Sequence, residues 1–178
     1  MYEKTYPNKR FKLTAEFLTK HIEPQAKILD LGVENPFSKI MKDNGYSVEN
    51  TKGEDLDLDT QTIEKSDATV VTAFEIFEHL LSPFTVLQSI KADKLVASVP
   101  LKLWFASAYR SKTDMRDRHF HEFEDWQFDW LLEKAGWKII DMQKWTNPTK
   151  KIGIRPILRF FTPRYYIVYA ERVEESNL

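Results

Sequence analysis

Cysteine is absent from this chain of 178 residues, which excludes disulfide bonds and thiolate metal sites. The chain also lacks an apolar run that approaches the roughly 20 residues needed to span a membrane, and its polar, charged N-terminus does not match a secretory signal. The formal net charge is only −1, so no long-range field attracts nucleic acid. We therefore expect a cytoplasmic protein with no transmembrane segment and no nucleic-acid partner; nothing in the sequence specifies an oligomeric state.

What the sequence does contain is typical of a globular protein, with 42% hydrophobic and 30% charged residues. Its length fits a single domain. We expect an N-terminal arm and helix over residues 1–24, a core over 25–145, and a C-terminal strand and tail over 146–178.

Short apolar runs alternate with segments of helical spacing, which predicts a doubly wound, mostly parallel α/β sheet. Helices are expected on both faces of the sheet, and the last strand is expected to be antiparallel. Acids and leucines alternate over 54–59, which suggests a short strand or an extended segment. The other strands are expected at 27–31, 46–50, 68–73, 94–100, 137–142 and 165–170. The helices are expected at 11–22, from Pro36 to Asn44, within 74–90 and over 123–135.

The first predicted strand ends in Asp30-Leu31-Gly32, followed by a break at Pro36. Ligands of such sheets bind outside the carboxyl ends of the strands. Gly32 provides one point where backbone can approach a ligand closely. Asp30 either orients this loop, caps the next turn, or binds a ligand amine through water. Glycine is scarce in the chain, and Val33, Glu34 and Asn35 occupy the positions where further glycines would be expected.

A second polar segment directly follows the buried strand at 68–73. Glu75, Glu78 and His79 would share one face at helical spacing, and such groups are rarely buried without partners. Three groups of this kind can bind a metal. Glu-x-x-Glu-His is not a metal signature by itself, however, so we expect no metal site.

These motifs, taken in order, resemble those of the class I S-adenosylmethionine-dependent methyltransferases. The resemblance is closest to the small-molecule branch that includes ubiquinone-biosynthesis O-methyltransferases, and it covers about residues 25–145. The motifs are Leu29-Asp30-Leu31-Gly32, Phe74 to Pro83, Ser98-Val99-Pro100, His119 to Phe123, and Lys134-Ala135-Gly136-Trp137. The first loop of the family usually reads Asp-x-Gly-x-Gly-x-Gly, so the glycine loop of this chain is degenerate.

The resemblance implies a Rossmann-like fold and S-adenosylmethionine as the cofactor. By the pattern of the family, Asp30 and Gly32 would hold its methionine part, and Glu34 would be tolerated beside its amine and sulfonium. Asn50 or Thr51 stands at the strand end where an acid normally grips the ribose, and Glu54 is the nearest acid. Adenine would contact Asp57 with Leu58, or Asp55 with Leu56. The turn with Phe74 and Glu75 would cover the cofactor, with His79 beside it.

Methyl transfer to a hydroxyl needs a base, and the candidates are His79, His119 and His121, because imidazole titrates near neutrality. Each of the three also has an ordinary structural role as its alternative.

Trp104, Phe105 and Tyr109 would either roof an acceptor pocket or pack against the sheet. Arg110 belongs to a local basic cluster that would either bind an anionic substrate or face solvent. The basic and apolar stretch from Lys150 to Arg164 would either touch a membrane or a lipid-linked substrate, or cover the sheet edge.

The sequence thus predicts an S-adenosylmethionine-dependent methyltransferase that acts on a small or lipid-linked acceptor. The alternative is a methyltransferase-like domain that has lost catalysis and serves as a binding or scaffold protein. A nicotinamide-dependent oxidoreductase is disfavoured, because neither the glycine pattern nor an acid about 20 residues further on matches.

Overall fold

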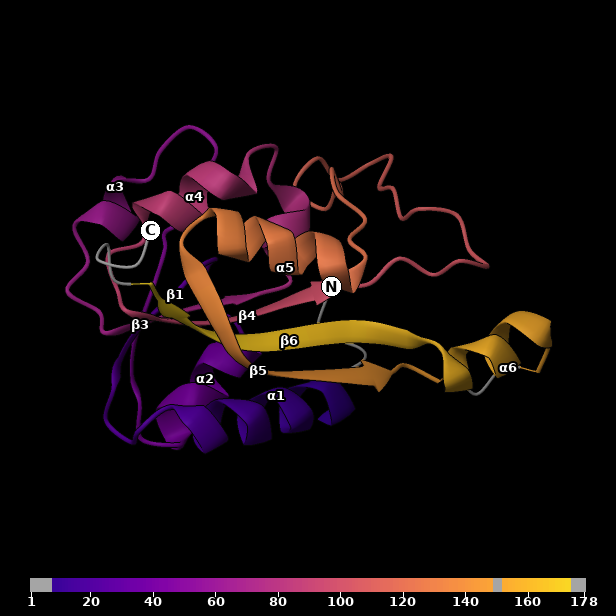
Figure 1. Ribbon diagram of the computed structural model, residues 1–178, viewed down its shortest axis with the longest axis horizontal. Coiled ribbons are helices and arrows are strands. Elements are labelled where there is room, and N and C mark those ends of the chain that lie inside the picture. The colour runs from indigo at the N-terminus through magenta and orange to yellow at the C-terminus, as the bar shows by residue number, and fades with distance from the viewer. Residues whose placement is uncertain (1–7, 149–151, 174–178) are drawn as a thin grey trace.

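The computed structural model describes residues 8–148 and 152–173, and its centre is a six-stranded sheet (Figure 1). The strands are β1 (Lys27–Asp30), β2 (Ser47–Asn50), β3 (Val70–Phe74), β4 (Lys94–Pro100), β5 (Trp137–Thr146) and β6 (Pro163–Arg172). Their spatial order is β2-β1-β3-β4-β6-β5. The first four strands are parallel, whereas β6 is antiparallel to both β4 and β5. The predicted mostly parallel sheet with an antiparallel last strand is confirmed.

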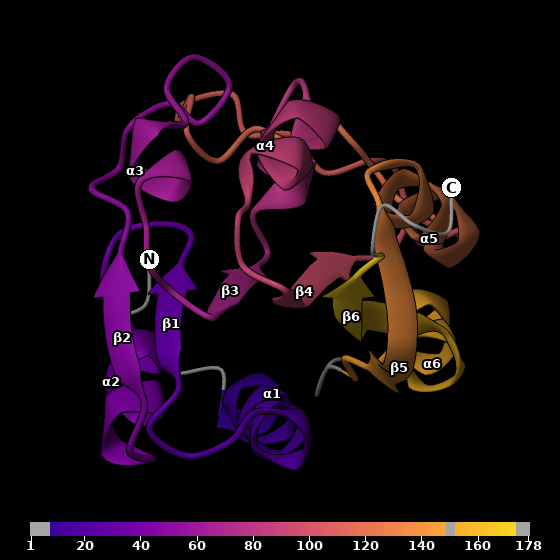
Figure 2. The same cartoon turned by 60° about the vertical axis from the view of Figure 1, so that its left-hand side comes forward.

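Helices cover both faces of the sheet, as predicted (Figures 1 and 2). On one face lie α1 (Asn8–His21) and α2 (Pro36–Asp43), and on the other lie α3 (Gln61–Glu64), α4 (Pro83–Ser89) and α5 (Asp125–Lys134). Each face has its own buried apolar cluster. Phe77 and Phe128 are central to the α4/α5 side, and Leu18 and Met41 to the α1/α2 side. A short 3₁₀ helix, η1 (Phe77–His79), follows β3.

Residues 54–59 form a turn rather than the expected strand or extended segment. The Asp55 side chain accepts the amide of Asp57, and the Asp55 carbonyl accepts the amides of Leu58 and Asp59. Asp is a turn former for this reason: its side chain bonds the backbone two residues on. In this chain the alternating acids and leucines therefore form a turn, not a strand.

The C-terminal strands are longer than predicted, and β5 and β6 project beyond the rest of the sheet (Figure 1). Between them lies α6 (Ile154–Phe161), where the sequence predicted only a connection. Of the N-terminal arm and helix predicted over residues 1–24, residues 1–7 lie outside the described residues, and the helix α1 begins at Asn8. Within the described part of the chain, no helix has both the length and the apolar character needed to cross a bilayer.

Candidate functional site

The candidate site lies at the carboxyl ends of β1 and β3, where the order of the strands reverses. The chain passes from β1 to its neighbour β2 on one side, then crosses back to β3 on the other side. In sheets of this kind the ligand crevice forms at that reversal. The loop after β1 and the turn after β3 meet here, because a Cβ placed on Gly32 would lie 3.3 Å from the Ile76 side chain.

Asp30, the last residue of β1, is 2% exposed and organises the base of the first loop. Its carboxylate accepts hydrogen bonds from Thr72 at 2.6 Å, Asn50 at 3.0 Å and Ser38 at 3.3 Å. Burial raises its pKa to about 6, although the three hydrogen bonds act in the opposite direction. Of the roles considered for Asp30, this geometry supports orientation of the loop.

Gly32 holds the loop in a conformation that favours glycine, with φ of +111°. Its amide donates to the Thr51 hydroxyl at 2.7 Å, and its carbonyl accepts from the Asn50 side chain at 3.2 Å. The end of β2 therefore fastens the loop after β1. Asn50 and Thr51 are used in this way, and the nearest acid beyond this strand end is Glu54.

The three residues that replace the expected glycines do not turn their side chains into the loop. Val33 is 53% exposed and covers Gly53, where an added Cβ would lie 2.9 Å from a Val33 methyl. Glu34 pairs with Lys42 of α2 at 2.6 Å on the protein surface. Asn35 caps α2 by accepting the amides of Phe37 and Ser38. The glycine loop is thus degenerate in sequence but leaves its backbone accessible.

Glu54 and Asp57 differ in how much of their acceptor capacity is used. One oxygen of Glu54 accepts the amide of Lys52 at 2.6 Å, while Oε1 is buried and has no partner with hydrogen-bond geometry among the described residues. Burial acts to raise the pKa of Glu54. The nearby Thr62 hydroxyl and backbone amides lower this pKa by more than burial raises it, so the net shift is downward. Asp57 accepts the amides of Leu81 and Ser82, both at 2.8 Å, so it ties two loops together.

The residues predicted to contact adenine differ in their exposure to solvent. Leu58 is 85% exposed at the edge of the turn, whereas Leu56 is buried in the core on the α4/α5 side. Asp55 stabilises the turn itself. Leu58 is therefore the apolar side chain that this turn exposes.

The turn after β3 carries backbone strain at Glu75, whose φ is +58°. A residue with a side chain pays about 1–2 kcal/mol for this conformation, and such strain clusters at functional sites. The Ser98 hydroxyl donates to Glu75 Oε1 at 2.9 Å, and Arg10 lies 3.5 Å from Oε2. Burial raises the pKa of Glu75 against these two interactions. Its neighbour Phe74 packs against Phe37 on the α1/α2 side.

Glu78, His79 and His119 converge, and their candidate ligand atoms all lie within 4.8 Å of one another. Glu78 is 1% exposed, and its pKa is raised well above the usual range by burial and then by Glu75. Its carbonyl accepts the amides of Phe120 and His121, which fastens that distant segment to η1. The expected common face of Glu75, Glu78 and His79 is not formed, since Glu75 turns to Ser98 and Arg10.

The three histidines predicted as bases, His79, His119 and His121, each have a ring nitrogen without a hydrogen bond to a described residue. His79 Nδ1 donates to the Arg118 carbonyl at 2.9 Å, so in the neutral ring Nε2 carries the lone pair. Burial, helped by His79 and Arg164, lowers the pKa of His119 to about 4. His119 Nδ1 and His121 Nε2 are buried without partners among the described residues. The His121 ring stacks on Phe123.

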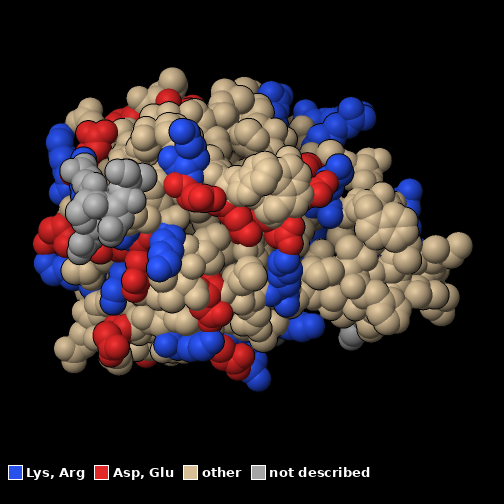
Figure 3. Space-filling view, viewed as in Figure 1, with Lys and Arg blue, Asp and Glu red and all other residues tan. Residues whose placement is uncertain are grey.

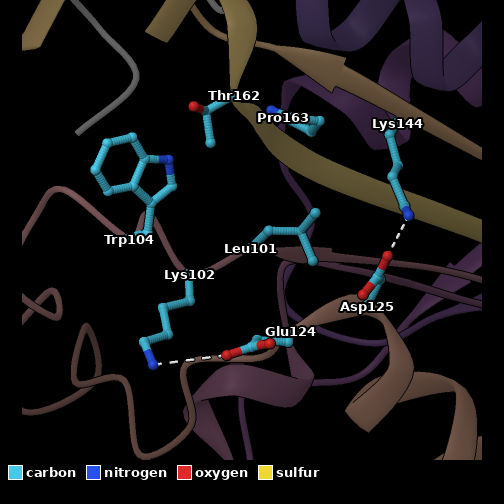
Figure 4. Close-up of a pocket in the computed structure, with 8 residues that line it drawn as sticks. All are labelled: Leu101, Lys102, Trp104, Glu124, Asp125, Lys144, Thr162 and Pro163. Atoms are coloured by element: carbon cyan, nitrogen blue, oxygen red, sulfur yellow. Dashed lines mark hydrogen bonds and ion pairs between the residues drawn. The ribbon is translucent and has the colours of Figure 1, made fainter. Parts of the chain in front are cut away.

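The residues predicted to contact an acceptor are separated. Trp104 is 73% exposed and lines a hollow of about 430 Å³ at the carboxyl end of β4, with Leu101, Thr162 and Pro163 (Figure 4). Ion pairs of Lys102 with Glu124 and of Lys144 with Asp125 border this hollow.

Tyr109 instead packs 4.7 Å from the His119 ring and donates its hydroxyl to Asp117. Arg110 is exposed. The hollow and the histidine cluster are thus two neighbouring parts of one edge, since the amide of Lys102 donates to the carbonyl of Phe123.

No family model matches this sequence, and no curated protein matches it significantly. Solved structures do match its fold. One is a 1,6-didemethyltoxoflavin-N1-methyltransferase of Burkholderia thailandensis with 1,6-didemethyltoxoflavin and S-adenosylhomocysteine bound (15% identity, 92% of this chain and 78% of that chain, TM-score 0.64). Another is an S-adenosylmethionine-dependent methyltransferase of Archaeoglobus fulgidus (15% identity, 91% and 94%, TM-score 0.58).

A third similar structure is the [4+2]-cyclase SpnF (12% identity, 97% and 84%, TM-score 0.56). At these identities the likeness concerns the fold. The strand order, the two helical layers and the solved structures together show that this chain has the class I S-adenosylmethionine-dependent methyltransferase fold.

Proposed function

We propose that this protein is an S-adenosylmethionine-dependent methyltransferase. The observation that carries the proposal is the Gly32 loop. Hydrogen bonds with Asn50 and Thr51 hold this loop at the point where the strand order reverses. The similar Burkholderia enzyme, with S-adenosylhomocysteine bound, supports it.

The residues at this edge fit the parts of the cofactor. The backbone around Gly32 would receive the methionine part, because a side chain there would meet Ile76. The Glu54 carboxylate would accept a ribose hydroxyl, and the exposed Leu58 would lie against adenine. The cofactor supplies an electrophilic methyl group on a sulfonium.

The contribution of the protein is to hold an acceptor in line with that methyl group, which can account for much of the rate. His79, His119 and His121 are the groups placed to receive a proton from an acceptor hydroxyl, since each has a ring nitrogen free of hydrogen bonds to the protein. Trp104 and the hollow beside it would receive the rest of the acceptor.

Calorimetric titration with S-adenosylmethionine and S-adenosylhomocysteine tests the proposal. We expect saturable binding of both, and none of NAD⁺ or NADH. If protein that is folded by circular dichroism gives no heat with either S-adenosylmethionine or S-adenosylhomocysteine, the proposal of a methyltransferase is refuted.

The second candidate function is a domain of this fold that has lost methyl transfer and acts as a binding or scaffold protein. The [4+2]-cyclase supports it, because that protein shares the fold but is described by a different reaction. The two candidates differ in turnover: the first consumes S-adenosylmethionine when a suitable acceptor is supplied, and the second does not.

We propose further that the acceptor is lipid-linked and reaches the hollow from a membrane surface. The helix α6 has no buried residue, and Ile154 and Phe161 are 79% and 80% exposed. From Lys144 to Arg164 the sequence has six basic residues and no acid, in a chain of net charge −1. Figure 3 shows this projecting end without red atoms. Apolar and basic side chains together favour an anionic lipid surface, and Thr162 and Pro163 join this end to the hollow.

Sedimentation with vesicles tests this surface. We expect binding to vesicles that contain phosphatidylglycerol and little binding to pure phosphatidylcholine. The double variant Arg155→Gln/Arg159→Gln should weaken partitioning roughly 30-fold, because each cation near the surface contributes about 1 kcal/mol. Phe160→Glu/Phe161→Glu should abolish it. The control Trp130→Glu alters a comparably exposed aromatic residue on α5 and should bind as the wild type does. Equal sedimentation of all variants would contradict the membrane contact.

A further inference from the structure

We propose that the hollow beside Trp104 binds a zwitterionic part of the methyl acceptor, an ammonium and a phosphate a few bonds apart, as in the head group of an aminophospholipid. Charges of both signs lie in pairs at the border of this hollow, and the pairs are Lys102 with Glu124 and Lys144 with Asp125 (Figure 4). Its volume of about 430 Å³ is within the roughly 300–1,000 Å³ of small-molecule sites.

The lining of the hollow has no net charge, because its two cations are balanced by two acids. The other lining residues are uncharged, and they are Leu101, Trp104, Thr162 and Pro163. A purely anionic ligand would meet the two carboxylates, and a purely cationic ligand would meet the two lysines. Since complementary potentials select the partner of a site, this lining favours a ligand that carries both signs.

The backbone determines where these charges lie. The amide of Lys102 donates to the Phe123 carbonyl at 2.8 Å, which places Lys102 beside Glu124, the N-cap of α5. Asp125 is the first residue of α5, and Lys144 reaches it from β5. Figure 4 shows both carboxylates at the same border of the hollow. An ammonium would thus find two carboxylates together, and a phosphate would find a lysine beside each of them.

The two ion pairs are exposed enough to be exchanged for a ligand. Their four side chains are between 33% and 54% exposed. Ion pairs with this exposure contribute little to stability. A zwitterion can therefore replace such a contact with two of its own, ammonium to carboxylate and phosphate to lysine. A ligand with a single charge would leave one member of the pair without a counter-ion.

Trp104 gives the hollow an aromatic wall. Its side chain is 73% exposed and lies across Leu101 from the pair of Lys144 and Asp125 (Figure 4). The face of a tryptophan ring attracts an ammonium within about 6 Å. The ring and the carboxylates would together hold the ammonium, while Leu101 and Pro163 offer apolar surface to the rest of the ligand.

The ammonium held in this way would not itself be methylated. Neighbouring carboxylates favour its charged form, and a protonated nitrogen has no lone pair with which to attack a methyl group. The reacting atom therefore remains an acceptor hydroxyl beside the histidines. That the bound molecule is the methyl acceptor rests on the proposed function, whereas binding of a zwitterion in the hollow does not.

An NMR chemical-shift titration of the isotope-labelled protein with glycerophosphoethanolamine, a soluble zwitterion, tests the hollow. We expect roughly millimolar affinity, because the contacts are exposed, and shift changes at the Trp104 indole N–H and the Thr162 amide. Ethanolamine and glycerophosphoglycerol each carry one of the two charges. Each should bind at least roughly tenfold more weakly, the equivalent of about 1.4 kcal/mol. Millimolar affinity for a head group is too weak to hold the protein on pure phosphatidylcholine.

Two variants locate the binding in the hollow. Lys144→Gln and Glu124→Gln should each weaken binding of glycerophosphoethanolamine by roughly tenfold. Glutamine keeps an oxygen that can accept the Trp126 indole N–H, as Glu124 does at 3.0 Å. Lys27→Gln is the matched control. It also removes an exposed lysine from an ion pair, that with Asp67 at 2.6 Å, but at the amino end of β1, away from the hollow. This variant should bind as the wild type does.

Equal affinity for the zwitterion and for either single-charge ligand would overturn the inference. So would unchanged affinity in Lys144→Gln and Glu124→Gln, or an equal loss in Lys27→Gln. If one of the two hollow variants fails to fold, the other decides. Titration of the same protein with S-adenosylhomocysteine separates this inference from the proposed function: cofactor binding without zwitterion binding sinks the inference alone, and zwitterion binding without cofactor binding sinks the methyltransferase alone.

Discussion

Gly32→Val is expected to weaken S-adenosylmethionine binding by at least roughly 100-fold, equivalent to about 2.8 kcal/mol. The wild-type residue has φ of +111°, and a Cβ there would lie 3.3 Å from the Ile76 side chain. The two further methyl groups of valine would fill the space where backbone must meet the cofactor. Calorimetry measures the affinity, and thermal unfolding measures the accompanying loss of stability, which we expect to be about 1–2 kcal/mol from the backbone conformation.

The matched control is Gly45→Ala. Gly45 also has a positive φ, +91°, but a Cβ there would meet nothing within 4 Å, and it lies at the far end of α2 from the site. This variant should lose similar stability and keep wild-type cofactor affinity. If Gly32→Val binds as the wild type does, the cofactor does not lie against this loop.

Asn50→Asp is expected to destabilise the fold by about 2–4 kcal/mol at pH 8, because it replaces a charge-assisted hydrogen bond with a repulsion. The Asn50 amide donates to Asp30 at 3.0 Å and to the Gly32 carbonyl at 3.2 Å. An acid is what the family pattern places near this strand end. In this chain the acid would face a buried carboxylate, so we expect it to weaken cofactor binding rather than restore it.

The pH dependence of Asn50→Asp follows from the sign of the shift. Burial already raises the folded-state pKa of Asp30 to about 6, and a second carboxylate would raise the pKa of the pair further. The folded state then binds more protons than the unfolded state above pH 4, so stability falls as pH rises through the folded pKa. Chemical denaturation at pH 5 and pH 8 measures this. Asn50→Ala removes one donor to Asp30 without adding charge, so its stability should fall with pH in the same direction but by less than that of Asn50→Asp. Equal stability of Asn50→Asp and wild type at pH 8 would contradict the assignment.

Much of the sheet was predictable because its strands are short buried runs with sharp ends. The strand at 94–100 has the predicted bounds, and Asn35 and Pro36 start α2 as their capping preferences indicate. The turn at 54–59 was not found, because Asp55 bonds its own backbone and so overrides an alternating pattern. The helix α6 was not predicted, because Pro156 and Pro163 favour a connection although Ile154, Ile157, Leu158 and Phe161 have helical spacing.

The site was predictable in its loops but not in its partnerships. Sequence spacing grouped Glu75 with Glu78 and His79, whereas the positive φ of Glu75 turns it toward Arg10 and Ser98. His119, forty residues after His79, takes the place of Glu75 in the cluster, because the amides of Phe120 and His121 donate hydrogen bonds to the Glu78 carbonyl. No local sequence pattern encodes these bonds. The sequence signal available for this part of the site was the two histidines His119 and His121, which lie in a segment without a clear period.

The degenerate glycine loop has a structural compensation that no local sequence pattern reveals. Val33 occupies the space that Gly53 leaves, so one glycine on the neighbouring loop accommodates the bulk added in the first. Gly53→Val should therefore push Val33 into the loop and weaken cofactor binding, which calorimetry would detect as a lower affinity in a folded variant.

The most direct test of the central claim is a crystal structure of the protein with S-adenosylhomocysteine. We expect density for the homocysteine part against the backbone of Gly32, for the ribose within hydrogen-bond distance of Glu54, and for adenine beside Leu58. A ligand bound elsewhere on the molecule, or no density in crystals soaked at a saturating concentration, would contradict the placement of the cofactor and with it the proposed methyltransferase.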